Sequence, residues 1–207
     1  MSTISRRSFL GNVAFTAAAS ALLSARGFLD SQGWLEAATA APSDVVHQTF
    51  NGLFAFVVPG PDEYSLAQGV STTEPGGLDA GAVDLFLETL DQSTPLPDFS
   101  AVVAGTLNGI AQQVNPAASA PFDAPFANLS FGEKVAVFGV VDSIDQLKLL
   151  GGLLPLFVAY FCYSEAGVLD RATRTLTGDP VGWRLSQYQG VSDGRNEFLG
   201  YFQNRRD

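Results

Sequence analysis

Residues 149–163 (LLGGLLPLFVAYFCY) are the most hydrophobic segment of the chain, and they constrain its fold more than any other feature. The segment has 15 residues, and a helix of that length spans about 22 Å, less than the ~30 Å hydrocarbon core of a bilayer. Gly151, Gly152 and Pro155 interrupt it. We therefore expect a central core helix of a globular protein, entered through a turn at the two glycines, with Pro155 in its first turn.

Helical periodicity recurs along the rest of the chain, whereas strand signals are scarce. Apolar residues at helical spacing mark residues 78–91, with Asp84 and Glu88 on the opposite side, and again residues 99–114. An earlier helix is expected over residues 45–58, ending at the sequence VPGP. These patterns predict an all-α fold: a bundle of about five helices with long connections and an irregular aromatic C-terminal segment.

The strongest helix start lies in residues 127–141 (ANLSFGEKVAVFGVV). Ser130 and Glu133 have the spacing of a capping box, in which each side chain accepts a hydrogen bond from the backbone N–H of the other residue. We therefore interpret Ser130 as a helix cap rather than as part of a glycosylation site at Asn128. The apolar residues of this helix that we expect to face inward are Phe131, Val135, Phe138 and Val141.

The N-terminus has the features of an export signal. Residues 5–10 (SRRSFL) match the twin-arginine motif, an alanine-rich apolar stretch follows, and Ala38 and Ala40 offer a small-residue cleavage site. The residues that carry the motif are Arg6, Arg7, Phe9 and Leu10. We predict a signal peptide over residues 1–40, recognised by the twin-arginine translocase, and one exported helical domain over 41–207 without a stable membrane span. An uncleaved signal that anchors the protein to the membrane is the alternative.

The charges are distributed unevenly along the chain. It has 11 basic and 21 acidic residues and a formal net charge of −10, which argues against nucleic-acid binding because that needs clustered lysine and arginine. No lysine or arginine lies between Arg26 and Lys134, whereas ten carboxylates lie between residues 44 and 123. This acidic half is either a solubilising surface or a face matched to a basic partner surface.

Residues with catalytic or ligand-binding chemistry are few. The single cysteine, Cys162, lies in an apolar run and is expected to be a buried, inert thiol, and the single histidine, His47, leaves no Cys/His cluster for a metal. The glycines of residues 76–81 follow no strand, so we expect a loop leading into a helix rather than a dinucleotide site. Asp62 and Glu63 are expected to be solvated loop acids. The sequence therefore predicts no catalytic, cofactor-binding or metal residue in this chain.

Five stretches occur in an order typical of one family. They are VVPGPDEYSLAQG (57–69), GGLDAGAVDLFLETLD (76–91), FANLSFGEKVAVF (126–138), YFCYSEAGV (160–168) and GDPVGWRLSQYQG (178–190). Over nearly the whole exported part, the chain resembles gluconate 2-dehydrogenase subunit 3-like proteins, in an actinobacterial, twin-arginine-exported branch. The shared motifs are helix patterns and loop signatures rather than catalytic residues.

The resemblance implies a non-catalytic small subunit that binds a flavin-dependent large subunit of the glucose–methanol–choline oxidoreductase type. The small subunit would carry the large one through the twin-arginine translocase on its own signal and then remain as an assembly partner. The large subunit would hold FAD, and a separate cytochrome c subunit would accept electrons. The resemblance therefore implies no cofactor in this chain, and it does not identify the substrate of the partner.

The aromatic segment 182–202 (GWRLSQYQGVSDGRNEFLGYF) is too interrupted by glycine for a regular helix. Its aromatic and arginine side chains are of the kinds enriched in interface cores, so we expect it to contact the partner, although it could instead fold over the helices as a lid. The residues predicted to contact the partner are Trp183, Arg184, Tyr188, Arg195, Phe198 and Tyr201. A second hypothesis is a stand-alone exported protein that binds a small molecule between helices, lined by Phe157, Tyr160 and Tyr163.

Overall fold

The computed structural model describes residues 30, 31, 33, 42–92, 98–186 and 188. The twin-arginine motif (Arg6, Arg7, Phe9 and Leu10) and the cleavage site lie outside these residues, as do Arg195, Phe198 and Tyr201. Within the described part, helices dominate and the only sheet has two strands. The predicted all-α class is therefore confirmed.

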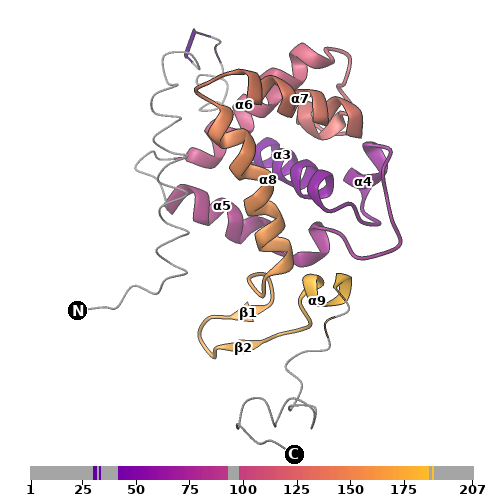
Figure 1. Ribbon diagram of the computed structural model, residues 1–207, viewed down its shortest axis with the longest axis vertical. Helices are drawn as coiled ribbons and strands as arrows, with labels where there is room; N and C mark the ends of the chain where they lie inside the picture. The colour runs from indigo at the N-terminus through magenta and orange to yellow at the C-terminus, as the bar shows by residue number, and fades with distance from the viewer. Residues whose placement is uncertain (1–29, 32, 34–41, 93–97, 187, 189–207) are drawn as a thin grey trace, which may run out of the picture.

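Five helices of ten or more residues form the body of the described chain (Figure 1). With the labels of Figure 1, they are α3 (Ser43–Val57), α5 (Val83–Gln92), α6 (Phe99–Val114), α7 (Phe131–Ser143) and α8 (Lys148–Tyr163). The shorter elements are α4 (Glu63–Ala67), η1 (Leu78–Ala80), η2 (Pro125–Asn128), β1 (Leu169–Asp170), β2 (Thr175–Leu176) and α9 (Val181–Leu185). The helices expected over 45–58 and 99–114 appear with bounds within two residues of the predicted ones. The helix expected over 78–91 begins only at Val83, because residues 78–80 form the separate turn η1.

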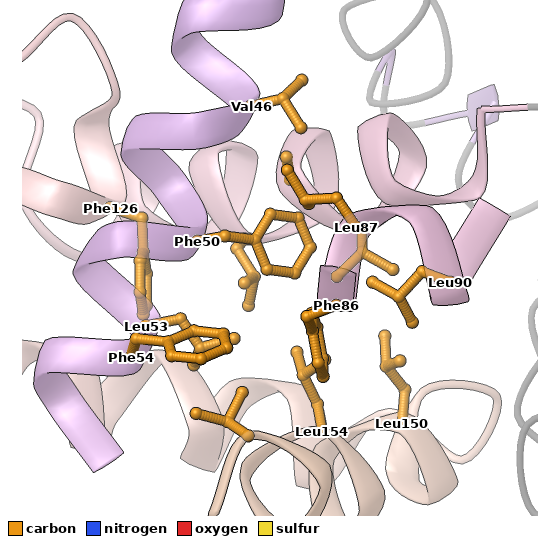
Figure 2. Packing of buried hydrophobic residues seen from close by; sticks show 14 of the residues in the cluster. Val46, Phe50, Leu53, Phe54, Phe86, Leu87, Leu90, Phe126, Leu150 and Leu154 are labelled. Carbon is orange, nitrogen blue, oxygen red and sulfur yellow. The ribbon is translucent and has the colours of Figure 1, made fainter. Parts of the chain in front are cut away.

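The hydrophobic core forms around α3, which contacts α4, α5, α6 and α8. Phe50, Leu53 and Phe54 of α3 are completely buried. The ring of Phe86, from α5, lies 5.7 Å from that of Phe50 and 5.4 Å from that of Phe54. The centroid of the Phe86 ring also lies 5.1 Å from the centroid of the Phe161 ring in α8. Phe86 thus joins three helices, and Figure 2 shows its ring between the α3 phenylalanines and the leucines of α8.

A close backbone crossing lies between the end of α3 and the start of η1. A Cβ atom at Gly76 would lie 2.5 Å from Cα of Gly60, so this crossing has no room for a side chain. The Gly77 N–H donates to the carbonyl of Val58 at 2.7 Å, which satisfies an acceptor just beyond the end of α3. The loop expected over residues 76–81 is confirmed, since it contains η1 and leads into α5.

α7 begins with the predicted capping box. Ser130 Oγ accepts a hydrogen bond from the Glu133 N–H at 3.4 Å, and Glu133 Oε2 accepts one from the Ser130 N–H at 2.8 Å. Glu133 Oε1 also accepts from the side-chain amide of Asn115, just beyond α6, at 2.7 Å. These contacts fix where α7 starts and attach its first turn to the end of α6.

We expect Ser130→Ala to lower the free energy of unfolding by about 1 kcal/mol, because the Glu133 N–H loses its acceptor. Urea unfolding of both proteins measures the difference. Ser143→Ala is the matched control, since the Ser143 hydroxyl donates to the Val140 carbonyl at the other end of α7 and caps no N–H. Equal losses in the two variants would mean that the cap contributes nothing of its own.

The buried side of α7 differs from the predicted one. Phe131 and Val135, both expected to face inward, are exposed, while Phe138 is half-buried. Of the four predicted residues only Val141 is fully buried, and α7 buries Lys134 and Val137 with it. Hydrophobicity alone assigns lysine to the solvent side, but here its amino group finds acceptors inside the protein, so its aliphatic stem can be buried. The side of α7 that packs against the core is therefore the one that carries Lys134 and Val137, not the one that carries Phe131 and Val135.

α8 starts before the two glycines, not after them as predicted. Its first residue is Lys148, and the Gly151 N–H donates to the Leu147 carbonyl at 2.9 Å. Gly151 allows close packing, because a Cβ atom there would lie 3.0 Å from Cγ1 of Val141 in α7. Pro155 lies in the helix interior rather than in its first turn, so it provides no N–H for the helical bond to the Gly151 carbonyl.

A hairpin and a short helix follow α8. β1 and β2 pair antiparallel, with Leu169 opposite Leu176, although the sequence pattern does not predict these strands. α9 falls in the segment expected to be irregular, so the beginning of that segment is helical. In the described part of the chain, no helix combines the length and hydrophobicity that crossing a membrane requires.

Candidate functional site

The outer side of α8 is apolar and exposed to solvent. Leu156 and Tyr160 are 60% and 58% exposed, and Leu149 and Tyr163 are exposed as well. These four positions recur at helical spacing and therefore lie along one side of the helix. After Lys148, α8 contains no charged residue. The opposite side is buried and carries Leu150, Leu154, Val158, Phe161 and Cys162. The segment predicted to be a central core helix is therefore only half buried, because other helices cover just one of its sides.

α9 adds aromatic side chains at the C-terminal end of α8. A Cβ atom at Gly182 would lie 2.6 Å from Cα of Tyr163, so the two backbones are in close contact. The rings of Trp183 and Tyr188 meet edge to face at 5.2 Å, and the Tyr188 N–H donates to the Trp183 carbonyl at 2.8 Å. Tyr188 and Arg184 are exposed and Trp183 is half-buried. We call the following set the α8–α9 face: Leu149, Leu156, Tyr160, Tyr163, Trp183 and Tyr188.

The α8–α9 face contains part of the predicted docking set and adds to it. Trp183, Arg184 and Tyr188 lie together within and just after α9, while the other three predicted residues lie outside the described part. Sequence reasoning missed the α8 contribution because it assigned every apolar residue of residues 149–163 to the core. The sequence offered no signal for the exposed side, since a helix without charge on any side is normally buried all round.

The residues proposed to line a pocket between helices separate in the structure. Phe157 is half-buried, whereas Tyr160 and Tyr163 are exposed on the outer side of α8. The Tyr160 ring meets the ring of Phe161 edge to face at 6.0 Å. The two tyrosines therefore present surface for a contact rather than walls for an enclosed ligand.

A fully buried lysine is the main polar feature of the interior. Lys134 of α7 is 0% exposed, and its Nζ donates to the Gly52 carbonyl of α3 at 3.1 Å and to Oε1 of Gln68 at 2.9 Å. The Nζ atom of Lys134 also lies 5.4 Å from the centroid of the Phe126 ring. Gln68, at the end of α4, donates through Nε2 to the Ala55 carbonyl at 2.8 Å. These contacts join α3, α4 and α7.

Burial lowers the pKa of Lys134 to about 7, and the nearby Asp62 carboxylate opposes this shift. Desolvation has this effect because it penalises the charged ammonium more than the neutral amine. A lysine with such a pKa resembles the activated amines of some enzymes. Here, however, the amine is enclosed by the protein and already hydrogen-bonded, so a substrate could not reach it. Lys134 therefore acts as a structural connection.

The other candidate groups also have structural roles. Cys162 is completely buried, as predicted, and burial raises the pKa of its thiol to about 12, which leaves little reactive thiolate. Asp62 is not the free loop acid expected from the sequence, because its carboxylate accepts the Ser65 N–H and hydroxyl, both at 2.8 Å, and caps α4. His47 Nδ1 lies 3.5 Å from the Asp84 carboxylate at the surface. Among the described residues, no group of three or more His, Cys, Asp or Glu is placed to hold a metal.

No family model, curated protein or solved structure matches the chain. The resemblance stated from the sequence motifs therefore stays a prediction.

Proposed function

We propose that this chain is a non-catalytic subunit that binds a flavin-dependent oxidoreductase of the glucose–methanol–choline type and helps to export it. The observation that carries the proposal is the α8–α9 face, a surface of leucine and aromatic side chains that are exposed except for the half-buried Trp183. Fully burying one such side chain is worth about 1.5–3 kcal/mol, so a partner that covers this face gains several of these contributions. Contiguous exposed apolar surface on a soluble protein is typical of protein interfaces.

The composition of the face supports a protein partner. Tyr160, Tyr163, Trp183 and Tyr188 are aromatic anchors of the kind that dominates binding energy at interfaces, and the exposed Arg184 follows Trp183 in α9. Their ring edges and hydroxyl groups can contact both apolar and polar groups of a partner. In the proposed complex the partner holds the FAD, and this chain contributes contact area rather than chemistry.

The proposed export route suits a docking face of this kind. Residues of α8 and α9 come together only when the chain has folded, because the contact of Gly182 with Tyr163 aligns the two helices. The twin-arginine translocase moves folded proteins, so a partner bound in the cytoplasm could cross with this chain on a single signal. We therefore place the working complex outside the cytoplasm.

Co-purification from the native host tests the proposal. The tagged full-length chain should bring down a flavoprotein with an FAD absorbance spectrum, and that flavoprotein should lack an export signal of its own. Recovery of the chain alone would refute the proposal. Recovery with a bound small molecule and no flavoprotein would favour the stand-alone binding protein instead.

The aromatic pair of α9 provides a smaller test of the same proposal. Trp183→Ala and Tyr188→Ala should each weaken binding of the co-purified flavoprotein by about tenfold, the loss of ~1.4 kcal/mol that truncation of an interface aromatic residue commonly causes. The melting temperature should change little for Tyr188→Ala, because that side chain is half exposed. Binding affinity can be measured by titration with the purified flavoprotein. Unchanged affinity in both variants would show that the pair is only structural.

A further inference from the structure

Residues 189–207 follow directly after Tyr188, which lies at one end of the α8–α9 face. Gly182 contacts the backbone of Tyr163 at the last turn of α8, and Tyr188 packs against the ring of Trp183. The sequence that follows Tyr188 is therefore tethered next to the C-terminal end of α8. A tethered segment is a candidate to cover this face when no partner is bound.

The segment is long enough to reach any part of the face. α8 has 16 residues, which corresponds to a length of about 24 Å. Phe198 follows Tyr188 by ten residues, and ten extended residues span up to about 33 Å. Gly190 and Gly194 lie within this stretch, and glycine readily adopts the backbone angles that a reversal of direction needs. Residues from Phe198 onward can therefore lie anywhere along α8.

The composition of the segment also fits an uncharged apolar surface. Four of the five residues from Phe198 to Phe202 are large and apolar, namely Phe198, Leu199, Tyr201 and Phe202. Residues 189–207 contain three acids and three arginines, so their formal charge is zero. Such a segment brings no net charge to α8, which carries none after Lys148. Its apolar cluster could bury Leu156 and Tyr160 without placing like charges together.

Tethering favours this segment over a second copy of the chain. A segment joined to the face by a short stretch of the same chain has an effective concentration on the order of millimolar, whereas a second molecule is present at its bulk concentration. At ~1 μM protein, contacts of equal strength would therefore favour the tethered segment by about a thousandfold. A partner must supply a larger interface in order to displace it.

We infer that residues 189–207 cover the α8–α9 face in the free chain, with the cluster from Phe198 to Phe202 against Leu156 and Tyr160, and that a partner displaces them. The displacement step rests on the proposed function, whereas the cover itself does not. The segment would keep an apolar surface away from other proteins until the partner binds. Its release would then make Trp183 and Tyr188 available as part of the same interface.

Disulfide trapping in the isolated full-length chain tests the cover. The trapping variant carries Leu156→Cys and Phe198→Cys, and the control carries Leu66→Cys and Phe198→Cys. Leu66 of α4 is 63% exposed and Leu156 is 60% exposed, so the two engineered thiols are equally accessible. The natural Cys162 is completely buried and does not compete. Under the same mild oxidation, the 156–198 disulfide should form at least about tenfold faster than the 66–198 disulfide, because proximity raises the local thiol concentration.

Three outcomes decide the inference. Faster formation of the 156–198 disulfide within one molecule supports it. Equal rates for the two pairs overturn it, and so does a 156–156 disulfide between two molecules, which would identify a second copy as the occupant. None of these results depends on a partner. The flavoprotein can still co-purify when the cover is absent, and the cover can exist when no flavoprotein is found, so the two proposals fail separately.

Discussion

Lys134→Ala should lower the free energy of unfolding by about 3 kcal/mol at pH 8, the largest stability effect that we expect from a single change in this chain. The substitution removes a buried aliphatic stem and leaves a cavity between α3 and α7. It also leaves Oε1 of Gln68, otherwise bonded at 2.9 Å, without a donor inside the protein. Urea unfolding at pH 8 measures the loss.

The stability of the natural protein should also depend on pH through the same residue. The pKa of Lys134 is about 7 in the folded chain, whereas an unfolded lysine titrates near 10.4, so above pH 7 the unfolded state binds the extra proton. Stability should therefore rise with pH, by about 2 kcal/mol between pH 7 and pH 9. The raised pKa of Cys162 acts in the opposite direction from about pH 8 upward, since the unfolded thiol ionises near pH 8.5, and it reduces the rise by less than about 1 kcal/mol at pH 9. A variant that changes Lys134 and keeps Cys162 therefore separates the two contributions.

Lys134→Met is the matched control for both effects. Methionine keeps most of the buried stem but has no amino group, so the loss at pH 8 should be about 1 kcal/mol rather than 3. The rise between pH 7 and pH 9 should disappear in this variant. A rise that persists in Lys134→Met would show that another group causes it and that Lys134 is charged in the folded protein.

Leu156→Glu should weaken binding of the co-purified flavoprotein by at least about 100-fold, the largest effect on binding that we expect. The side chain lies in the middle of the α8–α9 face, so a partner that covers it would have to bury an unpaired carboxylate. The melting temperature of the helical core should change little, because the helices leave residue 156 60% exposed. The charge would weaken only the inferred contact of residues 198–202 with α8. Titration with the purified flavoprotein measures the affinity, and a thermal melt checks the fold.

Leu66→Glu is the matched control for Leu156→Glu. It places the same charge at an equally exposed leucine, on α4 rather than α8. Affinity should stay within about twofold of the natural chain, since a surface charge outside the interface has little effect on binding. Equal losses in the two variants would mean that the partner is sensitive to total charge and that the α8–α9 face is not the binding surface.

Local patterns in the sequence were enough to predict the five long helices, but not the short helices α4 and α9. The capping box at Ser130 predicts the start of α7 because its two hydrogen bonds join residues three apart, and such contacts depend little on the rest of the protein. Apolar residues at helical spacing predict α5 and α6 for the same reason. The hairpin of β1 and β2 was missed because each strand has only two residues, too few for an alternating pattern.

The sides that the helices bury could not be predicted in the same way. Lys134 lies three residues before Val137 on the buried side of α7, but only the Gly52 carbonyl and the Gln68 side chain make that burial possible. Those acceptors belong to other elements, 82 and 66 residues away in the sequence. In α8, the sequence shows apolar residues all round but does not say which side other helices cover.

The sequence by itself determined the all-α class, the positions of the main helices and the buried, unreactive Cys162. Hydrogen bonds and apolar spacing within a few residues specify these features, so they can be read without knowing the tertiary contacts. Only the tertiary structure decided that α7 buries a lysine, that Asp62 caps α4 and that α8 keeps Leu156 and Tyr160 at the surface. Each of these features depends on which distant elements pack against a helix. The surface of this chain that we propose for partner binding is the part that this packing leaves uncovered.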